Sequence, residues 1–245
     1  MASKFSDQVV ALRDTWHAKN HPIYAGFAQG KVPIKALGVL MAQHYQFVTR
    51  VLPSFGLAYY NAPPDLRHFL LENLAEEEGL VAGPGEGREA VRHTDLITRF
   101  CRAAGLTDDE VLNTEQLPAW RARTYFYIAT MRDQPPGVVV AMQAVSEGQE
   151  PGIHQDCTIP GLIKHYGYKR TSPEIEFFTE HLVADTDHAG RQLMLADKLC
   201  NTPELQARAL EVVETLLKTR WASFNDVYRT AVLGQRDPLP EGIAA

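Results

Sequence analysis

The stretch EFFTEHLVADTDHAG, residues 176–190, decides the fold and indicates the kind of site that the chain builds. Within it His181, Asp185 and His188 are four and three residues apart, so on an α-helix their side chains leave one face over two turns. Phe177 and other apolar neighbours surround this polar stripe, and buried polar groups need partners. Imidazole and carboxylate ligands together suit iron, manganese or zinc. The alternative is a solvated helix face, and the apolar neighbours favour a metal site over it.

Helical segments continue on both sides of this stretch. Apolar residues recur at spacings of three and four, while prolines, glycines and capping residues separate the segments. We expect helices over residues 5–19, 33–52, 65–79, 89–105, 118–132, 137–148, 153–166, 173–199 and 203–228, with a further short helix that starts at Thr107. Pro53 should kink the helix before it, and Ser172 and Thr202 should cap the helices that begin at prolines.

No segment has the alternating pattern of a strand. The β-branched run GVVVAM, residues 137–142, lies inside a longer helical pattern. The expected fold is therefore all-α, a single domain of residues 1–236. It should be a bundle of about seven or more helices, followed by a short C-terminal tail, residues 237–245.

Composition narrows the class of protein. The chain has 245 residues, of which 45% are hydrophobic, and a formal charge of −6 from 24 basic and 30 acidic residues. This charge gives no electrostatic basis for binding nucleic acid. No apolar run is long enough to span a bilayer, residues 1–14 lack the apolar core of a signal peptide, and the three cysteines form no zinc-like or redox-like pair. We therefore expect a cytoplasmic protein that does not bind membranes.

Three more candidate ligands lie on other predicted helices. Glu77 follows Leu70 by seven residues, so it falls on the buried side of its helix, while its acidic neighbours Glu76 and Glu78 should face water. His93 begins the next helix, and Glu147 lies on a helix of small apolar residues, where an unpaired carboxylate is costly.

Carboxylates and imidazoles from several helices of one bundle form dinuclear iron sites in proteins. Structural zinc prefers four tight ligands, often thiolates, so six ligands favour two metal ions. The predicted ligand set is Glu77, His93, Glu147, His181, Asp185 and His188.

From about Asp14 to Tyr228 the chain resembles the heme-oxygenase-like diiron oxidases and oxygenases. Their pattern is a Glu and a His around one helix junction, a Glu on a middle helix, and a His–x3–Asp–x2–His helix, which these six residues match. The resemblance implies two iron ions, O2 as co-substrate, a homodimer and, for some reactions, an external electron donor. It also implies N-oxygenation, desaturation or C–C cleavage of a small-molecule substrate, and we expect an amino-acid-like one from a biosynthetic pathway.

The segments LLENLAEEEG, residues 70–79, and FFTEHLVADTDHA, residues 177–189, are most similar to the group of the chlamydial death-domain-associating protein, which forms aminobenzoate. That group is thought to consume one of its own tyrosines with the help of a lysine. Tyr24 matches the tyrosine, whereas Cys157 occupies the lysine position. Self-sacrificing p-aminobenzoate synthesis is therefore an alternative function.

Two further alternatives remain open. PGIHQD, which contains His154, is similar to the cofactor-free oxidase pyrroloquinoline-quinone synthase, but that enzyme lacks the Asp185 and His188 pair. The other alternative is a non-enzymatic binding protein of the same fold. Tyr24, His154 and Cys157 are candidates for contact with the substrate.

Four other polar residues received weaker interpretations. Arg123 and Lys164 are candidates to pair with a substrate carboxylate, although most such residues are solvated. His44 and His68 are expected to be surface or packing residues.

Overall fold

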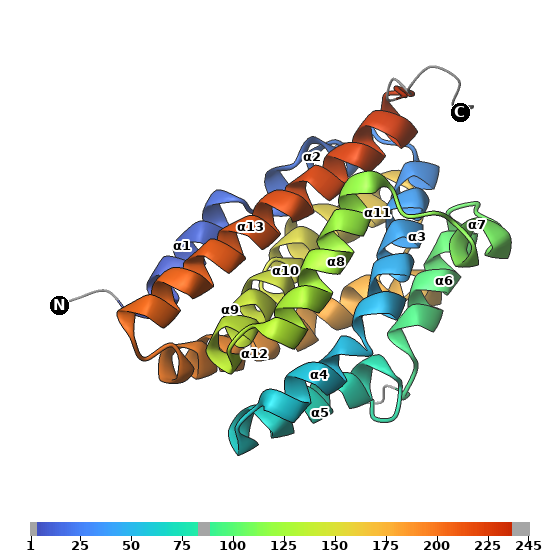
Figure 1. Cartoon of the computed structure of the whole chain (residues 1–245). Helices are drawn as coiled ribbons and strands as arrows, with labels where there is room; N and C mark the ends of the chain where they lie inside the picture. The colour runs from blue at the N-terminus through green and yellow to red at the C-terminus, as the bar shows by residue number, and fades with distance from the viewer. Residues whose placement is uncertain (1–3, 83–88, 237–245) are drawn as a thin grey trace, which may run out of the picture.

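The structure, a computed structural model, describes residues 4–82 and 89–236, and this part of the chain is helical without a strand (Figure 1). The all-α prediction is confirmed. The predicted tail, residues 237–245, lies outside the described residues. The α-helices are α1 Phe5–Thr15, α2 Pro22–Ala28, α3 Ile34–Val51, α4 Ser54–Asn61, α5 Pro64–Glu77, α6 His93–Ala103, α7 Asp108–Leu112, α8 Pro118–Asp133, α9 Pro136–Glu147, α10 Glu150–Ile153, α11 Ile159–His165, α12 Glu176–Leu199 and α13 Pro203–Val227.

Four short turns of other helical types connect or extend these helices. Three of them follow α1, α10 and α13, and one precedes α12. They are η1 Ala18–Asn20, η2 His154–Thr158, η3 Pro173–Ile175 and η4 Tyr228–Val232.

Helix α9 lies inside the bundle, because nine of its residues, from Gly137 to Val145, are buried. The long helices α12 and α13 both pack along it, and α8 packs against α13 (Figure 1). The small and β-branched side chains of α9 allow this close approach from several sides. The last residue of α9, Glu147, therefore reaches the interior without being exposed at the surface.

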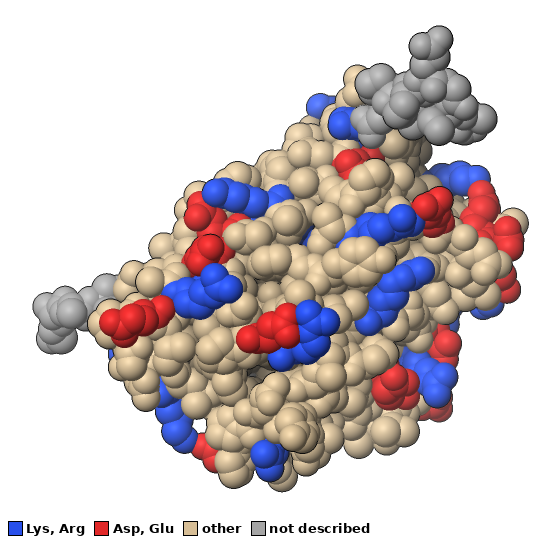
Figure 2. Space-filling view, viewed as in Figure 1, with Lys and Arg blue, Asp and Glu red and all other residues tan. Residues whose placement is uncertain are grey.

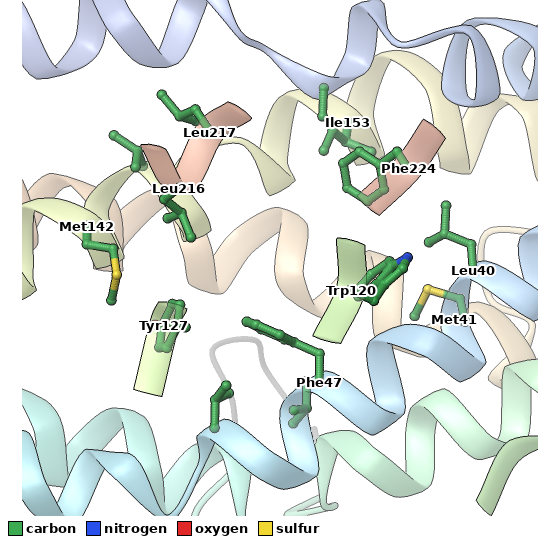
Figure 3. Packing of buried hydrophobic residues seen from close by; sticks show 14 of the residues in the cluster. Leu40, Met41, Phe47, Trp120, Tyr127, Met142, Ile153, Leu216, Leu217 and Phe224 are labelled. Atoms are coloured by element: carbon green, nitrogen blue, oxygen red, sulfur yellow. The ribbon is translucent and has the colours of Figure 1, made fainter. Parts of the chain in front are cut away.

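Aromatic side chains fill the space between α3, α8 and α13. Figure 3 shows Phe47 of α3 reaching between Trp120 and Tyr127 of α8. The ring of Phe47 lies 5.4 Å from that of Tyr127 and nearly perpendicular to it, as aromatic pairs prefer. This layer forms one wall of the interior cavity described below.

Three local predictions need correction. Helix α3 ends at Val51 and α4 is a separate helix, so Pro53 marks a break rather than a kink. The helix expected from residue 89 begins at His93. Ser172 makes no side-chain cap, because residues 173–175 form a 3-10 turn before α12 begins. In contrast, the Thr202 side chain accepts a hydrogen bond from the Leu205 amide, as predicted.

The surface shows no single-sign field on the face drawn in Figure 2, where acidic and basic side chains alternate over α8 and α13. Within residues 4–82 and 89–236, no helix is long and apolar enough to cross a membrane.

Candidate metal centre

The first group of candidate ligands joins three helices that are far apart in sequence. Glu77 ends α5, His93 begins α6 and His181 lies in the second turn of α12. The three residues offer ligand atoms that all lie within 4.8 Å of one another. His93 Nδ1 is 3.1 Å from Glu77 Oε2, and the rings of His93 and His181 are 4.5 Å apart. We call these residues the first triad.

Gly79 explains how His93 reaches Glu77 despite the intervening loop. It follows α5 with a φ of 65°, a conformation that residues with a Cβ rarely adopt. A Cβ atom at this position would lie 2.5 Å from the backbone nitrogen of Arg92. Only glycine therefore allows the backbone at residue 79 to lie this close to the backbone at Arg92. This close contact places the start of α6 beside the end of α5.

The second group joins α9 and α12. Glu147, Asp185 and His188 also offer ligand atoms within 4.8 Å of one another, and His188 Nδ1 lies 3.6 Å from Glu147 Oε2. We call these residues the second triad. His181 and Asp185 are one turn apart on α12, which corresponds to about 6 Å along the helix axis. The structure thus divides the six predicted residues into two adjacent triads.

The histidines have partners that orient their rings. His181 donates from Nδ1 to the carbonyl oxygen of Phe177 at 2.8 Å, which leaves Nε2 free to act as a ligand. His93 has Glu180 Oε1 3.8 Å from its Nε2, and His188 has Glu76 Oε2 3.4 Å from its Nε2. A carboxylate beside the outer nitrogen is the usual support of metal-binding histidines.

Several buried atoms of the site lack a hydrogen-bond partner among the described residues. They include His93 Nδ1 and Asp185 Oδ2, and the neighbouring Glu76 Oε2. His93 Nδ1 is close to Glu77, but the two groups are not aligned for a hydrogen bond. Two ligands that face the same metal ion have this arrangement. With metal–ligand distances of about 2 Å, such neighbours are about 3 Å apart. Unsatisfied buried polar atoms are rare in proteins, so these residues fit metal ions.

The first triad balances its charge internally. Burial by itself would raise the pKa of Glu77, but the neighbouring His93 outweighs it and lowers this pKa to about 2. Burial likewise opposes protonation of His93, yet Glu77 and Glu180 raise its pKa to about 10. Burial and the positive charge of His93 lower the pKa of His181 to about 4. Without metal, a charged Glu77–His93 pair therefore lies beside a neutral His181.

The second triad is short of positive charge. Burial raises the pKa of Glu147 to about 7, in spite of His188 and a 2.9 Å hydrogen bond donated by Gln192. Burial and the charge of Glu147 raise the pKa of Asp185 well above its usual range. The pKa of His188 is raised because Glu76 and Glu147 together outweigh the effect of burial. Two buried carboxylates of this kind favour a bound cation.

An interior cavity of about 80 Å³ opens onto both triads. One part of its wall is polar and contains Glu77 and His181 of the first triad and Glu147 and Asp185 of the second. Another part of its lining is apolar and comes from α3, α4 and the break between them: Phe47, Val48, Val51, Leu52 and Phe55. A smaller cavity adjoins it, because Arg123, Glu150, His44 and Phe177 line both.

The three predicted substrate-contacting residues have different positions. Tyr24 and His154 are buried and line the smaller cavity. Cys157 is buried too, but it is not among the lining residues of either cavity, and its sulfur lies 3.6 Å from the carbonyl oxygen of Lys19. Cys157 therefore lies outside the lining of these two cavities, and its contact with a substrate stays a prediction. The prediction for Cys157 came from its match to the lysine position of the resembling group, ten residues after Glu147, and this interval crosses the π-type turn at residues 154–158.

Among the other polar residues, only Glu76 differs from expectation, since His44 packs against Phe47 and Trp120. His44 lines both cavities, and burial lowers its pKa to about 3, whereas His68 is exposed as predicted. Lys164 is exposed and Arg123 is buried at the cavities. Glu76 was expected to face water, but it lies beside His188.

Sequence reasoning did not identify Glu180 or Gln192. Both lie on α12 within three or four residues of a candidate ligand, so the buried arc of α12 is wider than one stripe. A helix in contact with α6 on one side and α9 on another can bury such flanking positions. The spacing along α12 alone does not reveal these two residues, because their burial depends on the helices that pack against α12.

Comparisons with known proteins identify the family of the chain. A family model described as iron-containing redox enzyme matches residues 39–221. A 4-aminobenzoate synthase of Nitrosomonas europaea is 26% identical over 238 residues, which cover 91% of each chain. A 4-aminobenzoate synthase of Chlamydia muridarum is 27% identical over 202 residues, which cover 81% of this chain and 80% of that one.

Among solved structures, a domain of unknown function with a heme oxygenase-like fold from Shewanella denitrificans has a TM-score of 0.75 at 17% identity. The match covers 93% of this chain and 92% of the other. The similarity supports the predicted fold, and the family model covers well over half of the chain. The chain belongs to the heme-oxygenase-like family of iron-containing redox enzymes.

Proposed function

We propose that this protein is an O2-dependent oxidoreductase that holds one iron ion at each triad and oxidises a small, amino-acid-like substrate in the adjoining cavity. The observation that carries the proposal is the division of the six predicted ligands into two triads that face one cavity. Two neighbouring metal ions shared by carboxylates and histidines are a recurrent arrangement in helical bundles. The family description, iron-containing redox enzyme, supports iron over zinc.

Each part of the site has a distinct role in this proposal. When bound, the iron ions would supply the activation of dioxygen, the oxidant that accepts the electrons removed from the substrate, while the protein supplies ligands, orientation and a dry cavity. Glu147 and Asp185 would lose their protons on metal binding, because the cation takes the place of the protons. Glu180 and Glu76 place negative charge beside the outer nitrogens of His93 and His188, and the apolar part of the cavity lining keeps water from the reacting groups.

A second candidate function is 4-aminobenzoate synthesis from Tyr24. Two relatives that match most of the chain are named 4-aminobenzoate synthase. Tyr24 is 5% exposed and lines the cavity that adjoins the metal centre. The absence of a lysine at Cys157 weighs against this candidate. Intact-protein mass spectrometry after aerobic incubation with Fe(II) tests this candidate, because consumption of Tyr24 changes the mass of the chain. The substitution Tyr24→Phe should prevent both the mass change and the release of aminobenzoate.

The metal centre is tested by anaerobic titration of chelator-treated protein with Fe(II). We expect two equivalents for the unaltered protein and about one each for His181→Ala and His188→Ala, since each variant damages one triad. His68→Ala is the matched control, because His68 is exposed and belongs to neither triad. Uptake of less than one equivalent by the unaltered protein, or full uptake by both triad variants, would contradict the proposal.

A further inference from the structure

The interior contains an arginine that the metal centre does not use. Arg123 lies on α8, is 2% exposed, and lines both the cavity at the triads and the smaller one beside it. A guanidinium group is rarely buried without a carboxylate or phosphate to pair with it.

Arg123 has no ionic partner among the residues that the structure describes. Its Nε lacks a hydrogen-bond acceptor, although solvent does not reach it, and the guanidinium forms no ion pair with a described carboxylate. Its close contacts are the rings of Phe47 and Trp120, whose centroids lie 4.2 Å and 5.1 Å from Cζ. Aromatic faces offset only part of the cost of burying a charge.

The nearby carboxylate is already committed. Glu150 lines both cavities, but it forms a salt bridge with Arg220, which also donates to the carbonyl oxygen of Ser146 at 2.6 Å. Burial lowers the pKa of His154 to about 4, so this neighbour is neutral near pH 7. The charges of this group do not cancel, because two arginines, Arg123 and Arg220, face the one carboxylate of Glu150. One positive charge therefore has no counterion.

The cavity is therefore lined by both signs of charge. The triads provide carboxylates, and Arg123 provides an unpaired cation that also lines the smaller cavity, which none of the six candidate ligands lines. A planar guanidinium matches the two oxygens of a carboxylate. We propose that Arg123 binds the carboxylate of the substrate or product and that the ligand is a small monocarboxylic acid whose other end faces the triads.

This proposal rests on the proposed function for the reaction at the far end of the ligand, but its test does not require iron. Binding to chelator-treated protein is measured by calorimetry with 4-aminobenzoate and L-tyrosine, each compared with its uncharged carboxamide. We expect each acid that binds to bind more tightly than its amide. Arg123→Met should weaken binding of the acid at least about tenfold and leave the amide unchanged.

Arg121→Met is the matched control, because Arg121 lies on the same helix but is exposed and pairs with Glu115. Arg123→Lys keeps the charge without the planar fork, so binding should weaken less than in Arg123→Met. This variant also remains informative if Arg123→Met does not fold. Fe(II) uptake should be unchanged in both variants, which separates the carboxylate site from the metal centre.

The proposal is overturned if neither acid binds the unaltered protein more tightly than its amide, or if a folded Arg123 variant binds the acids as well as Arg121→Met does. Failure of iron uptake in the unaltered protein, with acid binding still dependent on Arg123, would instead refute the diiron function and leave the carboxylate site standing.

Discussion

The two triads have the same number of ligands but opposite charge balances. In the first triad, one carboxylate faces two imidazoles, and Glu77 and His93 neutralise each other at 3.1 Å. In the second triad, Glu147 and Asp185 face the single imidazole of His188, and burial raises the pKa of both carboxyl groups. The first triad is therefore already paired without metal, whereas the second has two carboxyl groups for one imidazole.

This difference indicates that the triads respond differently to loss of metal. A charged pair in the interior tolerates the absence of an ion, because each charge has its partner. Two buried carboxylates must instead take up protons or repel each other. We expect the second triad to gain more from a cation and to dominate the dependence of stability on metal and pH.

The largest expected effect is stabilisation by iron through the second triad. At Fe(II) concentrations about 1,000 times the dissociation constant, the free energy of unfolding should rise by about 4 kcal/mol. Asp185→Ala should remove at least half of this gain, as measured by anaerobic urea denaturation with and without Fe(II). Asp65→Ala, at an exposed position on α5, is the control. Retention of the full gain in Asp185→Ala would show that the second triad is not the main cation site.

The next effect concerns the ion pair of the first triad in metal-free protein. Glu77→Gln leaves His93 buried with Glu180 as its remaining close carboxylate, and breaking a buried pair costs about 3 kcal/mol. The ion pair contributes its full stabilisation between the ordinary pKa values of Glu and His, because both groups are then charged in the unfolded chain as well as in the folded one. Its contribution is lost as pH falls through about 2, the folded pKa of Glu77, or rises through about 10, that of His93.

Chemical denaturation at several pH values measures this cost. The difference between the unaltered protein and Glu77→Gln should be large near pH 6 and shrink toward pH 10. A difference that does not vary with pH would mean that packing, rather than the charge pair, accounts for the effect of the substitution.

Helical spacing was sufficient to predict five of the six residues that the structure gathers into the two triads, and particular residues show why. His181, Asp185 and His188 share one face by the geometry of an α-helix alone, and Glu77 and Glu147 lie on buried faces of helices whose periodicity is clear. An isolated carboxylate on an apolar helix predicts a partner, although it does not identify one. The fold class followed from the same periodicity.

The residues that spacing could not place depend on contacts between helices. Glu76 and Glu180 support His188 and His93 from positions next to a ligand, where one helix alone predicts exposure. The π-type turn after His154 changes the direction of Cys157. The surplus charge of Arg123 depends on Glu150 being paired with Arg220, and these residues come from three different helices.

A substitution in the second triad should have the opposite sign from Glu77→Gln. The pKa of Glu147 is about 7 in the folded protein, above its ordinary value, so the folded state binds more protons than the unfolded state between about pH 4.5 and 7. Stability of the metal-free protein should therefore fall as pH rises through this window. Glu147→Gln removes this loss and should stabilise the metal-free protein by about 2 kcal/mol near pH 8.

With saturating Fe(II) the order should reverse, because the amide is a weaker ligand than the carboxylate. Thermal denaturation of both proteins at about pH 5 and pH 8, with and without Fe(II), measures both signs. Destabilisation of the metal-free protein by Glu147→Gln at pH 8 would contradict the charge imbalance assigned to the second triad.

The smallest expected effect separates the triads through a residue that binds no metal. Gln192 is fully buried and donates to Glu147 Oε2 at 2.9 Å, which orients the carboxylate and stabilises its charged form. Loss of such a supporting group typically weakens metal binding about tenfold, so Gln192→Ala should weaken one of the two Fe(II) equivalents by this factor. Competition with a chelator measures each equivalent. The loss should grow as pH falls from about 8 to 6, because without its donor Glu147 holds its proton more tightly.

Gln206→Ala removes a comparable amide donor on α13, bonded to the Cys200 carbonyl oxygen, and should change neither equivalent. Equal weakening of both equivalents by Gln192→Ala would mean that the triads share one coupled site rather than two distinguishable ones.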